Sequence, residues 1–120
     1  MPVRSLHSSV LKWPDQHTVD KSARRWARQL QATHPELRRV GYFGSYARGD
    51  WGVGSDLDLV VLVEASDPPF CRRATGFPSE GLPVPAEVLV YTMGEWEARE
   101  ESSFLKTIAQ EVVWVLGSDL

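Results

Sequence analysis

The sequence has few of the features by which secreted and membrane proteins are recognised. It contains one cysteine, Cys71, so no disulfide can form within the chain, and this favours a reducing compartment. The longest purely aliphatic run, Leu59 to Val63, is far too short to cross a bilayer. Residues 1–13 lack the apolar run of a secretory signal. We therefore expect a cytoplasmic protein that does not enter a membrane.

A strong charge of one sign is also missing. The formal net charge is only −3, which makes nucleic acid a less favoured partner for the surface as a whole. The length of 120 residues is too short for two ordinary domains, whereas an apolar share of 42% suffices for one hydrophobic core. These numbers predict a single domain over residues 1–120.

The apolar residues alternate between helical and strand-like patterns, which predicts an α/β fold. From Thr18 to His34 they recur at the spacing of an amphipathic helix, with Asp15 or Thr18 available as its cap. Three short apolar stretches then predict strands over residues 37–43, 57–63 and 87–91. The second stretch is aliphatic on both faces after Asp58, so we expect it in the centre of the sheet.

A helix is predicted directly after the third strand. Thr92 and Glu95 have the spacing of a capping box, in which each side chain accepts a hydrogen bond from the other residue's backbone. Apolar positions continue from there to Val112. We expect them to cover the sheet from two helical pieces, with a break near Ser102.

Two segments lack such a pattern. Residues 1–14 mix polar and isolated apolar residues without periodicity, which indicates an N-terminal arm. Residues 65–83 contain four of the eight prolines, Pro68, Pro69, Pro78 and Pro83. We predict a long loop with little regular structure there.

Two acidic residues stand at the beginning of the central strand. Asp56 and Asp58 are two positions apart, so strand geometry points both carboxylates to one face. Two such charges about 4 Å apart repel by roughly 4 kcal/mol at an effective dielectric near 20, which favours protons or a divalent cation between them. Oxygen ligands favour Mg²⁺ or Mn²⁺ over zinc. The pair alone is equally typical of an ordinary surface strand end.

A Gly-Ser turn lies upstream of the acidic pair. Gly44 and Ser45 follow the first strand and stand about ten residues before Asp56, while Arg48 comes one helical turn later. A glycine lets the backbone approach a ligand closely, and a serine hydroxyl and backbone N–H groups can hold phosphate. Taken alone, the two residues would also suit a turn that merely ends a strand.

Other motifs do not fit the chain. The Gly-Lys-Ser/Thr of a P-loop is absent. The pattern DLDLV is shared with haloacid dehalogenases, but that family needs an apolar strand before the first aspartate, where this chain has GVGS. An Asp-x-Asp of the glycosyltransferase type would need a much larger domain for the nucleotide sugar.

The stretch FGSYARGDWGVGSDLDL, residues 43–59, resembles the signature of the DNA polymerase beta-like nucleotidyltransferase superfamily. It is most similar to the minimal nucleotidyltransferases, which are often encoded beside a HEPN-domain partner as toxin and antitoxin. Downstream, AEVLVYTMGEWE is similar to the strand that carries the family's third carboxylate, here Glu87. Most members have aspartate at that position. The resemblance implies a small mixed sheet with flanking helices.

The same resemblance implies a reaction and its residues. A nucleoside monophosphate, with AMP from ATP favoured, would pass to a hydroxyl group of a partner protein. Asp56, Asp58 and Glu87 would be the catalytic residues and would hold two Mg²⁺ ions, with Mn²⁺ as a substitute. The nucleotide would be bound by Gly44, Ser45 and Arg48. The expected partner is a HEPN-domain protein that this chain modifies as its antitoxin.

Two alternatives stay open from the sequence. The chain would be a binding module if it neutralised its partner by occlusion and its site were vestigial. It would be an RNA-directed nucleotidyltransferase if a basic cluster bound RNA, and this cluster comprises Arg24, Arg25, Arg28, Arg38 and Arg39.

Overall fold

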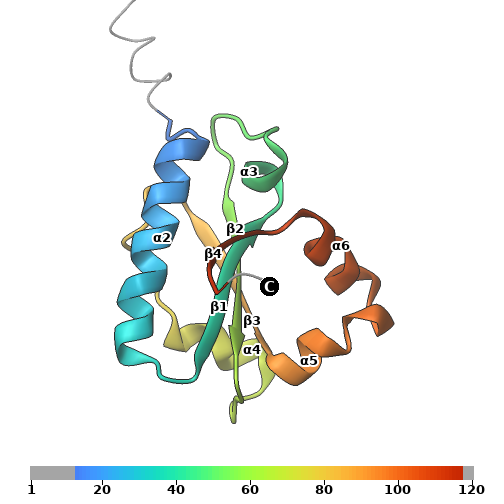
Figure 1. The fold of residues 1–120 in the computed structure, drawn as a ribbon. Coiled ribbons are helices and arrows are strands. Elements are labelled where there is room, and N and C mark those ends of the chain that lie inside the picture. Colours follow the sequence, from blue (N-terminus) through green and yellow to red (C-terminus); the bar gives the residue numbers. More distant parts are fainter. Residues whose placement is uncertain (1–12, 118–120) are drawn as a thin grey trace, which may run out of the picture.

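A four-stranded mixed sheet organises the computed structural model, which describes residues 13–117 (Figure 1). The strands lie in the order β3-β2-β1-β4. β1 runs antiparallel to both β2 and β4, whereas β2 and β3 are parallel. Their bounds are Leu37–Phe43 for β1, Leu57–Val63 for β2, Ala86–Thr92 for β3 and Val113–Leu116 for β4. The expected α/β class and mixed sheet are confirmed.

The central strand β2 divides the core in two because its side chains alternate between the faces of the sheet. Its odd-numbered residues, from Leu57 to Val63, belong to one buried cluster. Val60 and Leu62 belong to the other, and Asp58 shares their face by the period of two. The predicted central position of this strand is confirmed. Asp58 therefore lies on the side of the sheet that is covered by the helices packed on Val60 and Leu62.

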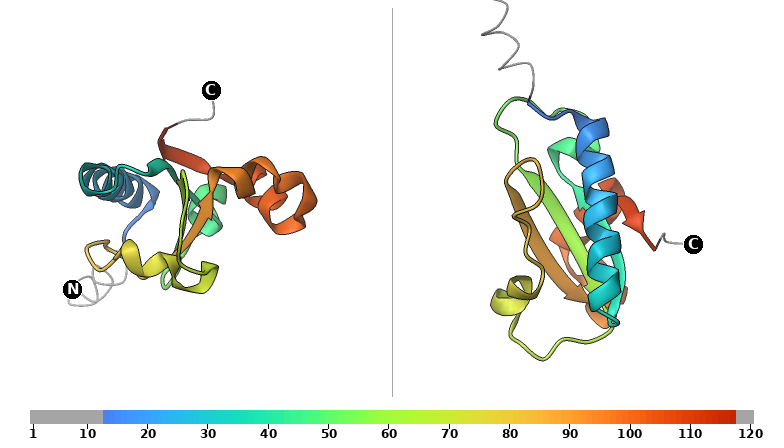
Figure 2. Two further views of the ribbon diagram at one scale, coloured as in Figure 1. Left: turned by 90° about the horizontal axis from the view of Figure 1, so that it is seen from below. Right: turned by 90° about the vertical axis from the view of Figure 1, so that its left-hand side faces the viewer.

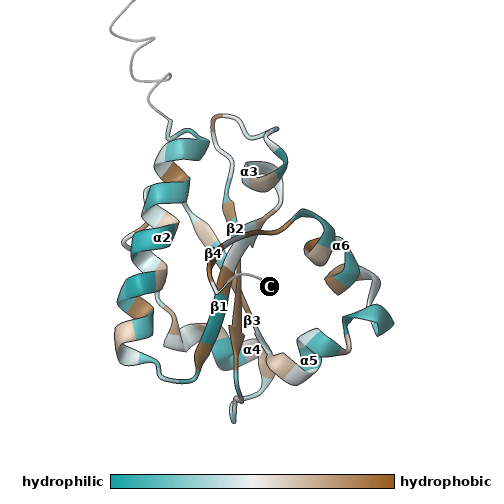
Figure 3. Ribbon diagram, viewed as in Figure 1, coloured by the Kyte–Doolittle hydropathy of each residue, from teal (hydrophilic) through white to brown (hydrophobic). Residues whose placement is uncertain are grey.

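One face of the sheet is covered by helix α2, Gln16–Thr33 (Figure 2). Asp15 caps it, since its carboxylate accepts a hydrogen bond from the backbone N–H of Thr18 at 2.9 Å. Figure 3 shows hydrophobic residues along the central strands and mainly hydrophilic ones on α2, as expected of an amphipathic helix. The helix buries the apolar stripe predicted from the sequence: Val19, Ala23, Trp26, Ala27 and Leu30.

The opposite face is covered by a chain of short helices (Figure 2). They are α5, Met93–Glu97, the 3-10 turn η2, Arg99–Glu101, and α6, Ser103–Glu111. The capping box predicted for Thr92 and Glu95 is present. Ser102 caps α6 through the N–H of Leu105, which confirms the break expected there. The buried residues of this layer are Trp96, Leu105 and Ile108.

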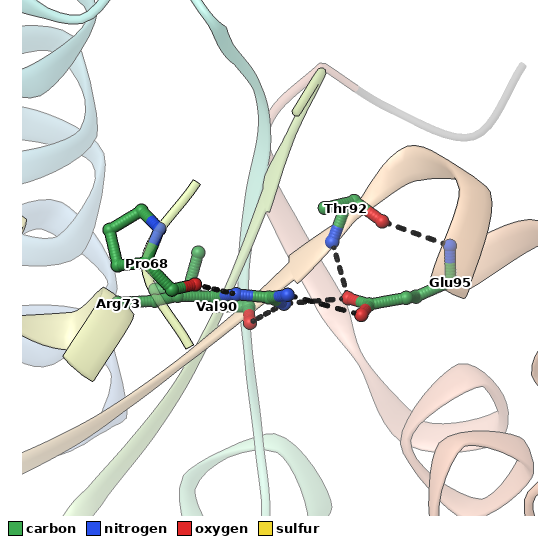
Figure 4. Close-up of polar contacts among 5 residues, drawn as sticks. All are labelled: Pro68, Arg73, Val90, Thr92 and Glu95. Carbon is green, nitrogen blue, oxygen red and sulfur yellow. Dashed lines mark hydrogen bonds and ion pairs between the residues drawn. The ribbon is translucent and has the colours of Figure 1, made fainter. Parts of the chain in front are cut away.

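The proline-rich segment contains more regular structure than the sequence predicted. Helix α4, Phe70–Arg73, and the 3-10 turn η1, Ala74–Gly76, lie within residues 65–83. Figure 4 shows the reason: the Arg73 guanidinium donates to the Glu95 carboxylate at 2.7 Å and to the Val90 carbonyl at 3.3 Å. These bonds tie the segment to the start of α5. The expectation of a long loop with little regular structure was therefore wrong for residues 70–76.

The C-terminal end also differs from the prediction. The sequence assigned Val112 to the helical stripe, but α6 ends at Glu111 and Val112 already has extended backbone. Residues 113–116 then form β4, which pairs with β1 and was not predicted. The short run of β-branched and aromatic residues is favoured in a strand once an edge is available beside it.

Most of the predicted N-terminal arm, residues 1–12, lies outside the described residues. Of the rest, the Trp13 indole donates a hydrogen bond to the Tyr46 hydroxyl at 3.1 Å, and that hydroxyl donates to the Pro14 carbonyl at 2.9 Å. Both residues are therefore docked beside helix α3, Ser45–Arg48. Within residues 13–117, no helix is long and apolar enough to span a membrane.

Candidate functional site

The site begins at the turn that follows β1. Gly44 has φ 78° and ψ −151°, a conformation that essentially only glycine adopts. Phe43, the last residue of β1, pairs with Asp58 in the sheet, so the turn passes directly over that side chain. A Cβ atom at Gly44 would overlap the Oδ2 atom of Asp58. The glycine therefore allows the backbone of the turn to contact a carboxylate on the neighbouring strand.

Asp58 is half-buried, whereas Asp56, just before β2, is exposed. Burial raises the pKa of the Asp58 carboxyl, and the negative charges of Glu87 and Asp56 raise it further. Glu87 lies beside Asp58 because the two are register partners in the parallel pair of β2 and β3. A positive charge bound here would remove the repulsion that these carboxylates exert on one another.

Helices α3 and α6 flank this end of the sheet (Figure 1), and residues of both line a cavity of about 400 Å³. Five of the six residues that the sequence singled out line it, and Glu87 is the exception, standing exposed on β3. The remaining lining residues come from the end of β1 and from α6. The complete lining is Phe43, Gly44, Ser45, Arg48, Asp56, Asp58, Phe104, Thr107, Ile108 and Glu111.

Arg48 is the cation of this cavity. It ends the short helix α3, and its side chain is half exposed. Its Nε atom donates to the Asp50 carboxylate at 3.1 Å, and its Nη1 atom donates to the Glu111 carboxylate at 3.4 Å. Exposed ion pairs of this kind contribute little to stability because water screens them, so Arg48 can exchange one of them for a phosphate group at little cost.

Glu111 is a residue of the cavity that the sequence analysis did not identify. Its Oε2 atom accepts a hydrogen bond from the backbone N–H of Gly44 at 2.6 Å, in addition to the contact with Arg48. A signal was present in the helical spacing, since Glu111 follows Phe104 and Ile108 by seven and three residues and replaces the next apolar residue of that stripe. Its carboxylate links the last turn of α6 to the turn after β1.

Phe104, at the other end of α6, supplies an aromatic wall. Its exposed fraction is 51%, which is unusual for a phenylalanine, and it contacts the Phe43 ring edge-on with centroids 6.2 Å apart. The cavity thus has an apolar end on α6 and a polar end, where a Gly-Ser turn, an arginine and two aspartates meet.

Comparison with protein families identifies the family to which the chain belongs. The model of the nucleotidyltransferase domain family matches residues 23–115, which is most of the chain and includes every lining residue of the cavity. The chain belongs to this nucleotidyltransferase family. The resemblance inferred from the Gly-Ser turn and the acidic pair is thereby confirmed at the level of the family. A comparison with curated protein sequences gave no match.

Solved structures share the fold of this nucleotidyltransferase. A protein from Sulfolobus solfataricus, described as a candidate nucleotidyltransferase, superposes with a TM-score of 0.61 at 22% identity, covering 82% of this chain and 80% of that one. A toxin-antitoxin structure with AMP-PNP superposes with a TM-score of 0.52 at 17% identity, covering 80% of this chain and 74% of that one. These similarities place the sheet and helices described above in a known architecture.

The donor set fits a hard divalent cation in its chemistry. Asp56 and Asp58 offer carboxylate oxygens on the cavity side, and Glu87 adds negative charge from the next strand. Within residues 13–117, no three side chains of the His, Cys, Asp or Glu type are already gathered as metal ligands. A cation would therefore be held by the two aspartates first, and the exposed side chain of Glu87 would have to turn toward it.

Proposed function

We propose that this chain transfers a nucleoside monophosphate from an NTP, with ATP favoured, to a hydroxyl group of a partner protein. One observation carries the proposal: the glycine-dependent turn after β1 and the acidic pair of β2 line the same cavity. Family membership supports the reaction class. Nucleotide transfer needs both elements together, since one seats the phosphates and the other balances the charge that develops during the reaction.

The roles follow from the two sides of the cavity. The backbone and hydroxyl of Ser45 would seat the β- and γ-phosphates beside Gly44. Arg48 would give up a carboxylate partner and neutralise these phosphates as they leave. Asp56, Asp58 and Glu87 would hold Mg²⁺, which supplies Lewis-acid chemistry at the phosphates and the acceptor.

The bond changes define what the side chains must do. The acceptor oxygen forms a bond to the α-phosphorus, the bond between that phosphorus and the bridging oxygen breaks, and pyrophosphate leaves with the electron pair. The acceptor proton must go to a base near the attacking oxygen. Glu87 is suited to this role, as the alternative to completing the metal site, because its side chain is exposed beside Asp58 and does not line the cavity. Asp58 is the weaker candidate because we assign its carboxylate to the cation.

The acceptor is proposed to be a separate protein. Within residues 13–117, the helices and strands form one sheet with its two covering layers, and this described part of the chain contains no second domain for an acceptor. A toxin-antitoxin structure shares this fold, which supports a partner protein of the toxin-antitoxin kind here. The AMP-PNP in that structure supports ATP as the nucleotide. We infer a HEPN-domain ribonuclease as the acceptor and this chain as its antitoxin.

The test uses labelled ATP with the full chain, with and without the cognate partner. We expect label on the partner only in Mg²⁺, and calorimetric ATP binding that EDTA strongly weakens. The double variant Asp56→Asn/Asp58→Asn should abolish transfer and neutralisation together, by orders of magnitude in rate. Neutralisation that survives in the folded double variant would instead establish occlusion. Efficient labelling of tRNA alone would establish the RNA-directed alternative.

A further inference from the structure

Helix α6 forms the far wall of the cavity with one of its faces. Phe104, Thr107, Ile108 and Glu111 all line the cavity and follow one another at intervals of three and four residues. Such positions lie above one another on a helix. Phe104 and Glu111 are seven residues apart, which corresponds to about 10 Å along the helix axis. The wall therefore leads from the phosphate turn, where Glu111 contacts Gly44, to the aromatic end at Phe104.

The length and chemistry of this wall match an extended nucleotide. With the phosphates at the Gly44 turn, the sugar comes next along α6 and the base lies last. Thr107 occupies the middle position, and its hydroxyl proton is already donated to the Ser103 carbonyl at 3.0 Å. The oxygen of Thr107 is thus left as an acceptor, which suits a ribose hydroxyl.

Phe104 is placed to contact the base. Among residues 13–117, the large hydrophobic side chains that are exposed are Val53, Phe70 and Phe104, and Phe104 is the one that lines this cavity. The Phe43 ring meets it nearly at right angles, at 84°, and so braces the ring from one side. Stacking on an aromatic side chain accepts any base, because every base has a π-face.

We propose that Phe104 is the stacking surface for the nucleobase of the bound nucleoside triphosphate, with Thr107 accepting a hydrogen bond from the ribose. The proposal rests on the proposed function, because it needs an NTP whose phosphates lie at the Gly44 turn. In this arrangement the base adds binding energy to that of the phosphates. Helix α6 is then the element that distinguishes a nucleotide from bare phosphate.

The test compares two ligands, Mg²⁺-ATP and Mg²⁺-tripolyphosphate, by titration calorimetry on the full chain. Phe104→Ala should weaken ATP binding about tenfold or more, the effect of removing an aromatic ring from under a base. Binding of tripolyphosphate should not change, because it has no base. Phe104→Trp should restore ATP binding. Phe70→Ala is the matched control, since Phe70 is similarly exposed at 45% but packs on Tyr91 outside the cavity.

Each other outcome overturns the inference. An equal loss of both ligands in Phe104→Ala would show damage to the phosphate site, and unchanged ATP binding would show that the base lies elsewhere. In both cases the parent still binds ATP, so the proposed function stands without this inference. A parent that binds neither ligand would overturn the proposed function as well.

Discussion

Gly44→Ala tests whether the turn and the acidic pair work as one unit. The substitution adds a single Cβ, which would overlap Oδ2 of Asp58. That oxygen is the far end of a side chain with two rotatable bonds, so the carboxylate will rotate away more easily than the paired backbone will shift. The methyl group therefore displaces the carboxylate that we assign to the metal while leaving its chemistry intact.

The magnitude follows from the backbone of the turn. Gly44 lies at φ 78° and ψ −151°, where a residue with a Cβ loses about 1–3 kcal/mol. Gly49 offers a matched control: it ends α3 at φ 89° and ψ 6°, and no atom lies within 4 Å of a Cβ built there. Gly49→Ala loses about 1–2 kcal/mol from its left-handed backbone alone. The two variants should thus be destabilised to a similar extent.

Urea denaturation measures the stability of both variants, and calorimetry measures their binding of Mg²⁺-ATP under conditions where both are folded. We expect Gly49→Ala to bind ATP as the parent does. Gly44→Ala should lose most of the binding that depends on Mg²⁺, which is also the loss that we expect of Asp58→Asn. If Gly44→Ala is folded and binds ATP as tightly as Gly49→Ala, the contact between the turn and the carboxylate has no role in the site.

Two further predictions concern stability. The raised pKa of Asp58 means that the folded protein favours the neutral carboxyl, so the charged form of Asp58 lowers the stability of the fold. Without metal, Asp58→Asn should therefore be more stable than the parent at pH 7. Urea denaturation across pH should show this difference shrinking as the pH falls toward the ordinary aspartate pKa of about 4. In the same assay, Arg73→Met should lower the free energy of unfolding by about 1–3 kcal/mol, because it removes the donors to Glu95 and Val90. The control Arg72→Met changes an exposed neighbour and should lower it by less than about 0.5 kcal/mol, and equal losses would contradict the role of the ion pair.

The elements that could be predicted are those whose signal is local. The cap at Asp15, the capping box at Thr92 and the aliphatic strand β2 are each defined by residues a few positions apart, and all three are present. Strand β4 has no such signal, because a short apolar run directly after a helix fits either continuation. The run becomes a strand because it pairs with the free edge of β1, whose residues lie some 70 positions earlier in the chain.

The site shows the same division. Gly44, Ser45, Asp56 and Asp58 were predicted from their spacing, which the two antiparallel strands preserve when they bring the turn over the acid. Glu111 could not be assigned a role in this way, because its partner is a backbone N–H 67 residues earlier and a backbone group has no residue type to recognise.

The position of α6 follows from the side chains of β2 rather than from the site. Val60 and Leu62 point to the face that α6 covers, and they bury Leu105 and Ile108 beneath it. Asp58 precedes them on the same face, at the point where the strand emerges from under the helix. Packing α6 on its apolar neighbours therefore also sets it opposite the carboxylate. The wall of the cavity is thus an extension of the core, so the packing that stabilises the sheet also shapes the nucleotide site that we propose.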